Sequence, residues 1–225
     1  MERFQQMQHH YASLARACAG VCLAMLLGAA ATPALAIQSD DYVQEPGMGL
    51  NEAAPEGVPF ELPEGLTLET PIKGYNAADP EGCDQKYEDQ AVGGGEQVRI
   101  CLVFNNNSDL PANLQMPPGL MFVSRSTDIQ NGMITQRIAI EVPAKTRYYQ
   151  PIFMSCLNSG RDTSALSSEY DMGPVTKLPA FLELFKMLEG KVLDRWGWAV
   201  VDMAVSDIAD TGEISEAARE HIEAL

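Results

Sequence analysis

Histidine is scarce in this chain, and its placement limits the chemistry that the protein can perform. Of the three histidines in 225 residues, His9 and His10 lie close to the N-terminus and His221 lies close to the C-terminus. Ser-His-Asp and Cys-His hydrolases need an imidazole that structured surroundings hold as a proton shuttle. Zinc sites usually take several imidazoles or thiolates. The sequence therefore argues against histidine-dependent hydrolysis and against a histidine-built metal site.

Positive charge is also in short supply. The chain has 15 lysines and arginines against 31 aspartates and glutamates, which gives a formal net charge of −16. A negative field of this size repels phosphate backbones and anionic head groups, so we expect neither nucleic acid nor a bare membrane as a partner. Residues 37–70 contain no basic residue, and their carboxylates are interleaved with prolines and glycines. We expect this segment to be extended, because it cannot bury enough apolar surface to offset its ordering entropy.

The chain also lacks an apolar run that could span a bilayer. The run at residues 17–30 has about 14 residues, against the ~20 that a spanning helix needs. Small residues of the A-x-A type follow at 32–36, as in a signal peptide. We therefore predict a signal peptide over residues 1–36, export to the periplasm or the medium, and no integral membrane segment after cleavage. Lipid attachment at Cys18 or Cys22 is the less favoured alternative.

Three cysteines follow the predicted leader, and an oxidising compartment would pair two of them. Cys83 lies in a polar, turn-like context, whereas Cys101 lies in an apolar strand pattern, where a buried thiol persists as a small hydrophobe. We therefore favour a Cys83–Cys156 disulfide with Cys101 free, and Cys101–Cys156 is the close alternative. A reactive thiol ranks below both, because no basic neighbour is evident to lower its pKa.

Alternating apolar residues predict strands in the middle of the chain. Apolar side chains at every second position mark a strand from Val98 to Phe104. Further strands are expected at 120–124, 133–142 and 147–157, joined by turns rich in proline, glycine and asparagine. Strands at such intervals are typical of an antiparallel sandwich, which we place at residues 71–157.

Two runs in this region resemble the Ig-like modules of bacterial exported and surface proteins. In those modules a strand that ends in Asn leads through a loop to a Pro-Gly turn that opens the next strand. The matching runs are VRICLVFN at 98–105 and LQMPPGLMFVS at 114–124, and the resemblance covers about residues 97–157. It implies a β-sandwich scaffold and no particular chemistry, because such folds host many functions.

After Cys156 the spacing of apolar residues becomes helical. Pro179 opens a first helix and Gly190 ends it, a second helix spans 192–206, and Ser215 caps a third. We expect residues 158–225 to form a helical region packed on the sandwich, which makes the fold mainly β with α. The second helix is expected to bury Val192, Leu193, Trp196, Ala199, Val200, Met203 and Ala204. A less favoured interpretation makes the large aromatic residues a docking face for a partner: Phe181, Phe185, Trp196 and Trp198.

Two segments invite a chemical interpretation. The segment around Cys156 is similar to secreted thioester domains, in which a cysteine cross-links to a downstream glutamine. No glutamine follows Gln150, and Asp202 is the best substitute. The loop with Asp207, Asp210 and Glu213 offers oxygen ligands of the kind that Ca²⁺ takes, but its spacing departs from the helix-loop-helix calcium pattern. We therefore predict no cofactor and no metal.

These observations favour an exported, non-catalytic binding or structural protein of the bacterial envelope, with a protein or glycan partner. Two alternatives stay open. One is a glycan hydrolase that uses a pair of carboxylates, because so many acidic residues always allow some suitable pair. The other is a covalent adhesin built on Cys156.

Overall fold

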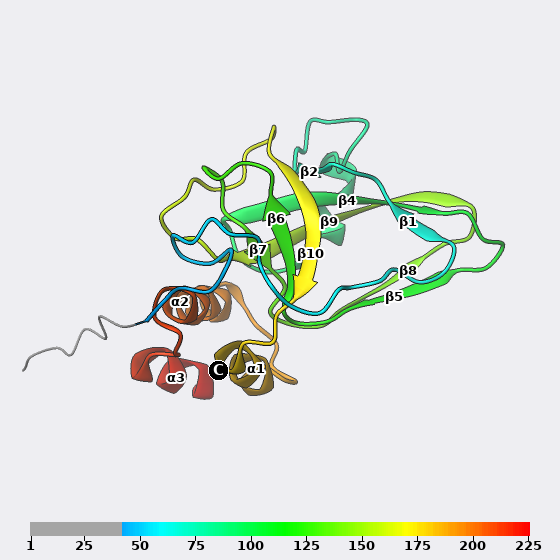
Figure 1. Cartoon of the computed structure of the whole chain (residues 1–225). Coiled ribbons are helices and arrows are strands. Elements are labelled where there is room, and N and C mark those ends of the chain that lie inside the picture. Colours follow the sequence, from blue (N-terminus) through cyan, green and yellow to red (C-terminus); the bar gives the residue numbers. More distant parts are fainter. Residues whose placement is uncertain (1–41) are drawn as a thin grey trace, which may run out of the picture. The chain divides into compact units, whose positions relative to one another are not determined.

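The computed structural model describes residues 42–225, and its main feature is an eight-stranded sheet that closes on itself (Figure 1). Strand β4 (Val98–Asn106) pairs with β9 (Thr146–Cys156) along its full length. From β4 the ring continues through the strands β2 (Ile72–Gly74), β10 (Glu169–Val175), β6 (Leu120–Ser124) and β7 (Gly132–Met133), which pairs with β9. β1 (Leu66–Leu68) and β3 (Val92–Gly93) extend the sheet beyond β4 and β9.

This closure corrects the predicted Ig-like sandwich. A sandwich has two sheets with open edges, whereas here β4 pairs with β9 and six strands form a barrel. A separate pair of strands, β5 (Ala112–Met116) and β8 (Ile138–Val142), packs its alternate apolar side chains on the same core. The predicted strand at 133–142 is therefore two strands, β7 and β8, with residues 134–137 between them. The mainly β character is confirmed.

The cysteine pairing differs from the prediction. Cys83 is bonded to Cys101, with 5.5 Å between their Cα atoms, and Cys156 is a buried free thiol. The physical reason is strand parity. Ile100 and Leu102 belong to the barrel core, so Cys101 points to the outer wall, where the loop that carries Cys83 covers it. Cys156 belongs to the core cluster inside the barrel, and β9 places Pro151 rather than Cys156 opposite Cys101.

The N-terminal part of the described chain has little regular structure before β1 and contacts the body at a few buried residues. Met48 is 3% exposed and lies in the same apolar cluster as the helices. The carbonyl of Gly47 accepts hydrogen bonds from the side-chain amides of Asn131 and Asn158, both buried. Leu66 in β1 joins the barrel core. The predicted signal peptide over residues 1–36 lies outside the described residues.

Three helices form a cap that lies together on one side of the barrel (Figure 1): α1 (Pro179–Met187), α2 (Arg195–Thr211) and α3 (Glu216–Glu223). Their ends follow ordinary capping chemistry. The Asp194 carboxylate accepts from the backbone N–H of Gly197, Gly212 ends α2 with a φ of 82°, and the Ser215 hydroxyl accepts from Ala218 N–H. Strand β10 falls within the region that we expected to be helical.

The buried face of α2 is rotated from the predicted one. Four residues expected on that face are open to solvent: Ala199, together with Val192, Trp196 and Met203, which are 97%, 64% and 38% exposed. The helix begins at Arg195, so Val192 precedes it, and the stripe that packs on the barrel is centred one residue later. The buried residues of α2 are Gly197, Val200, Val201, Ala204, Val205, Ile208 and Ala209.

Candidate functional site

The segment between β7 and β8 joins the barrel to the helical cap. Residues 134–137 leave the barrel wall and pass the C-terminal end of α1. The Gln136 side chain donates through Nε2 to the carbonyl oxygens of Leu188 and Lys191, each at 3.0 Å. The last carbonyls of a helix lack partners within the helix, so this amide both caps α1 and holds the segment in place.

Beside this segment lies a hollow of about 560 Å³, which we call the cationic groove. Its volume falls within the range of about 300–1,000 Å³ that is usual for ligand sites. Three basic side chains and one acidic side chain line it, together with apolar surface. The lining residues are Pro118, Thr135, Gln136, Arg137, Phe185, Lys186, Leu188, Glu189, Gly190 and Lys191.

The three cations of the cationic groove lack the ion pairs that most basic side chains of the described residues form. Seven basic side chains within residues 42–225 form ion pairs with carboxylates: Lys73, Lys86, Arg125, Lys145, Arg147, Arg195 and Arg219. In the described part of the chain, Arg137, Lys186 and Lys191 form neither an ion pair nor a side-chain hydrogen bond. A cluster of unpaired cations in a protein of net charge −16 creates a local site for an anion.

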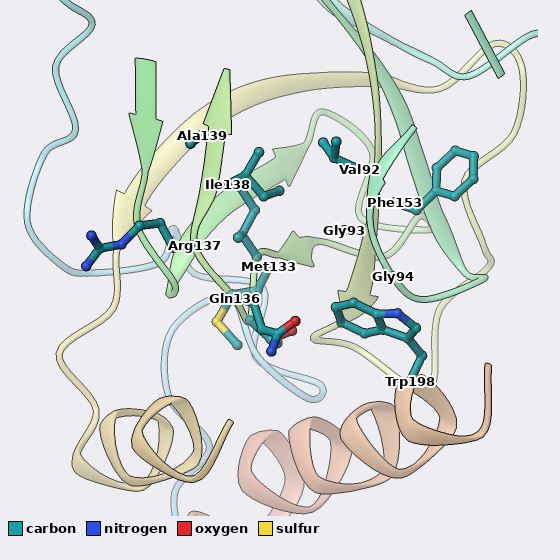
Figure 2. Close-up of a pocket in the computed structure, with 12 residues that line it drawn as sticks. Val92, Gly93, Gly94, Met133, Gln136, Arg137, Ile138, Ala139, Phe153 and Trp198 are labelled. Carbon is teal, nitrogen blue, oxygen red and sulfur yellow. The ribbon is translucent and has the colours of Figure 1, made fainter. Parts of the chain in front are cut away.

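A smaller hollow of about 210 Å³ adjoins the cationic groove and shares Thr135, Gln136 and Arg137 with it. We call it the Trp198 hollow. Figure 2 shows the indole of Trp198 beside Gly94, with Gln136 across the hollow and the Arg137 side chain directed away from Trp198. A Cβ atom on Gly94 would lie 1.8 Å from Cδ2 of Trp198, so the glycine backbone packs directly on the ring system. Only glycine permits this approach.

The four aromatic residues predicted as a docking face occupy three different environments. Phe181 is fully buried and stacks on Phe185, with their ring centroids 6.1 Å apart. Phe185 lines the cationic groove, and Trp198 lines the smaller hollow. Trp196 is 64% exposed and lines neither. The structure therefore brings two of the four, Phe185 and Trp198, to the candidate site.

The carboxylate of Asp202, in α2, is largely buried beside Ser155 of β9. Burial raises the pKa of Asp202 to about 6, the nearby Ser155 hydroxyl opposes part of this rise, and Glu96 adds to it. Neither Asp202 Oδ1 nor Ser155 Oγ has a hydrogen-bond partner among the described residues. Burial, followed by the Asp202 charge, also raises the pKa of the Cys156 thiol to about 11. Such a thiol is a weak nucleophile at neutral pH, and the thioester hypothesis remains a prediction.

The acidic residues considered for Ca²⁺ do not lie in one loop. Asp207 and Asp210 belong to the last turns of α2, and only Glu213 follows the helix. Asp210 contacts the Ser159 hydroxyl at 3.1 Å, and Asp207 accepts from Ser215. Within residues 42–225, no group of three or more His, Cys, Asp or Glu side chains is arranged to hold a metal ion.

Sequence reasoning missed the cations of the site. Sequence analysis assigned no role to Lys186 or Lys191, and nothing in the chain order links them to Arg137, about fifty positions earlier. The available signal was the scarcity of basic residues, which makes each of them informative. Their convergence depends on the path of residues 134–137, which the single predicted strand at 133–142 concealed.

No helix within residues 42–225 combines the length and apolar character needed to cross a membrane. Comparison with protein-family models, curated proteins and solved structures finds no match for this chain.

Proposed function

We propose that this protein is an exported, non-catalytic binding protein of the bacterial envelope that holds an anionic group of its partner in the cationic groove. The observation that carries the proposal is the cluster of Arg137, Lys186 and Lys191, three cations that no carboxylate neutralises. Charge-assisted hydrogen bonds from such groups to a carboxylate or phosphate are about twice as strong as neutral ones.

Two observations support export. The chain begins with a signal-peptide pattern, and Cys83 is bonded to Cys101. Disulfides persist in oxidising compartments such as the periplasm and the extracellular medium. Fractionation of the producing cells tests this part of the proposal. We expect a periplasmic or secreted product that begins after residue 36, and a cytosolic product that retains Met1 would contradict it.

The acidic character of the rest of the chain gives the groove its selectivity. With a net charge of −16, most of the surface repels anions, so an anionic ligand is directed to the few positions where cations are unpaired. Glu189 also lines the groove, and its negative charge further restricts where a negative group can be placed.

The test compares two triple variants of equal charge. Arg137→Ala, Lys186→Ala and Lys191→Ala remove the groove cations, and Lys86→Ala, Lys177→Ala and Arg195→Ala remove one arginine and two lysines elsewhere. Binding of soluble polyanions, namely polyglutamate, polyuronate and polyphosphate, is measured by calorimetry at low and high salt. We expect at least one polyanion to bind in a salt-sensitive manner, and the groove variant to weaken it about tenfold or more.

The control variant is expected to bind as the wild type does. Equal losses in both variants would mean that net charge alone governs binding, and the proposal would fail. Absence of binding to every polyanion would also contradict it.

A further inference from the structure

We infer that the ligand of this site is an acidic oligosaccharide, in which a pyranose ring occupies the Trp198 hollow and a carboxylate reaches the cationic groove. The inference rests on the proposed function and adds the chemical class of the ligand. It comes from the fact that two hollows of different chemistry share three consecutive residues, Thr135, Gln136 and Arg137.

The two hollows suit chemically different parts of one ligand. The Trp198 hollow is lined by the partly exposed apolar side chains of Val92, Phe153 and Trp198, and its one charged lining residue, Arg137, points away from the indole (Figure 2). The cationic groove holds three positive charges and one negative charge. A ligand that fills both must therefore be uncharged and flat-sided at one end and anionic at the other.

The hydrogen-bonding groups of the Trp198 hollow suit hydroxyl groups. Nε2 of Gln136 already donates to two backbone carbonyls, so its free oxygen, Oε1, can only accept. The Thr135 hydroxyl, which has no side-chain hydrogen bond within the described residues, can both donate and accept. A sugar hydroxyl can donate to Gln136 Oε1, and a neighbouring sugar oxygen can accept from Thr135.

The indole supplies the apolar contact that a sugar ring needs. Aromatic faces carry partial negative charge, which attracts the C–H groups on the face of a pyranose. Gly94 packs on the bond that joins the two rings of Trp198, and both residues line the hollow. The hollow, about 210 Å³, has the volume of about seven water molecules at ~30 Å³ each. It therefore accommodates a single ring more readily than an extended peptide.

The groove cations then select the acidic group. Arg137 belongs to both hollows, so a carboxylate on the ring in the Trp198 hollow, or on the next ring, lies within the field of Arg137. Lys186 and Lys191 extend the positive surface along α1 and the residues after it. The arrangement matches an oligomer of uronic acids better than a neutral glycan.

The experiment uses the two tryptophans of the chain as matched reporters. Trp196→Phe leaves Trp198 as the only indole, and Trp198→Phe leaves the exposed Trp196. Each protein is titrated with three probes: a uronic-acid oligosaccharide, the neutral oligosaccharide of equal length, and oligoglutamate of equal charge. Binding is followed by calorimetry and by tryptophan emission.

We expect the uronic-acid oligosaccharide to bind the wild type and the Trp196→Phe variant equally well, and to change the emission of Trp198 in the latter. The neutral oligosaccharide should bind about tenfold more weakly. Trp198→Phe should weaken uronate binding severalfold and leave the emission of Trp196 unchanged on titration. Thr135→Val, which keeps the side-chain shape, should weaken uronate binding and spare oligoglutamate.

Three results would overturn the inference. If oligoglutamate bound as tightly as the uronate, the site would not select a sugar, although the proposed anion site would stand. Uronate binding without a change in Trp198 emission would place the ring elsewhere. Failure of both anionic probes to bind would overturn the inference, and it would contradict the proposed function as well if polyphosphate also failed to bind.

Discussion

The barrel and the helical cap handle their charges in different ways. On the barrel wall, exposed carboxylates meet arginines directly, as in the Arg125–Asp171 and Arg147–Glu69 pairs. Where the cap meets the barrel, Asp202 is buried without a cation, and Arg137 and Lys186 face a groove without a carboxylate partner. The junction of the two parts therefore holds charged side chains that have no ion-pair partner.

This contrast indicates which part is scaffold and which is site. Ligand sites commonly lie where structural units meet, because side chains that converge there are not all needed to fill a core. The barrel core is a closed set of apolar side chains from many strands, while the junction contains both hollows. This comparison predicts that the barrel is the more stable part and that the junction contains the charged groups without partners.

The largest expected effect compares the same truncation in both cores. Ile100 in β4 and Ile208 in α2 are each fully buried. Ile100→Ala and Ile208→Ala should each lower the free energy of unfolding by about 2–5 kcal/mol. The loss should be greater for Ile100, because a closed ring of paired strands collapses into the cavity less easily than a docked helix does.

Urea unfolding followed by circular dichroism measures both losses. Val192→Ala, at a side chain that is 97% exposed, is the control and should shift the free energy of unfolding by no more than about 0.5 kcal/mol. A greater loss for Ile208→Ala would show that the cap, and not the barrel, limits stability.

The disulfide belongs to the barrel side of the comparison. Replacing both Cys83 and Cys101 with alanine should lower the free energy of unfolding by about 3 kcal/mol, as expected for a loop closed over a separation of 18 residues. Peptide mapping of the native protein should recover Cys83 linked to Cys101, with Cys156 alkylated only after denaturation. A Cys83–Cys156 link would refute the argument from strand parity.

On the junction side, Asp202 should make stability depend on pH. Burial raises its pKa from 3.8 to about 6, so the unfolded chain releases this proton at lower pH than the folded chain does. The folded state therefore loses up to about 3 kcal/mol from this group as the pH rises from about 4 to above 6. Asp202→Asn should remove that loss and raise the free energy of unfolding at pH 8, measured by urea titration at several pH values. An unchanged pH profile would mean that water reaches the carboxylate.

Local sequence patterns predicted many of the strands and helices, but they did not predict how the strands pair over long distances in the chain. Alternation located β4, β6 and β9, and Pro179 and Ser215 marked the starts of helices that the structure contains. Closure of the barrel depends on which strands pair across long separations, such as β2 with β10, and no local pattern encodes that choice.

The errors share this origin. The pairing of Cys83 followed from the polarity around each cysteine, although the parity of Cys101 relative to Ile100 already placed its thiol on the outer wall. The sequence predicted part of the site, because Phe185 and Trp198 were among the aromatic residues considered for docking. It did not predict Arg137, which comes from the segment between β7 and β8. Basic residues in an acidic chain repay individual attention.

The smallest expected effect concerns Glu69, whose ionisation stabilises the fold, whereas the ionisation of Asp202 destabilises it. Arg147 donates to both carboxylate oxygens of Glu69, and these hydrogen bonds lower the Glu69 pKa despite partial burial. A carboxylate with a lowered pKa stabilises the fold at pH values above the usual pKa of a glutamate. This stabilisation is lost as the pH falls through the pKa of the folded state. Both side chains are 39% exposed, so solvent limits the pair to about 0.5 kcal/mol.

Glu69→Gln should therefore reduce the free energy of unfolding slightly at pH 7, and this loss should shrink as the pH falls below the usual range of a glutamate. Asp202→Asn, by contrast, should act only above pH 4 and in the stabilising direction. Glu141→Gln, at an exposed position on β8, is the control for loss of a negative charge alone. If Glu69→Gln stabilised the protein at pH 7 as Asp202→Asn does, general repulsion in an acidic chain would outweigh local pairing. The barrel wall and the junction would then not differ in the way their contacts indicate.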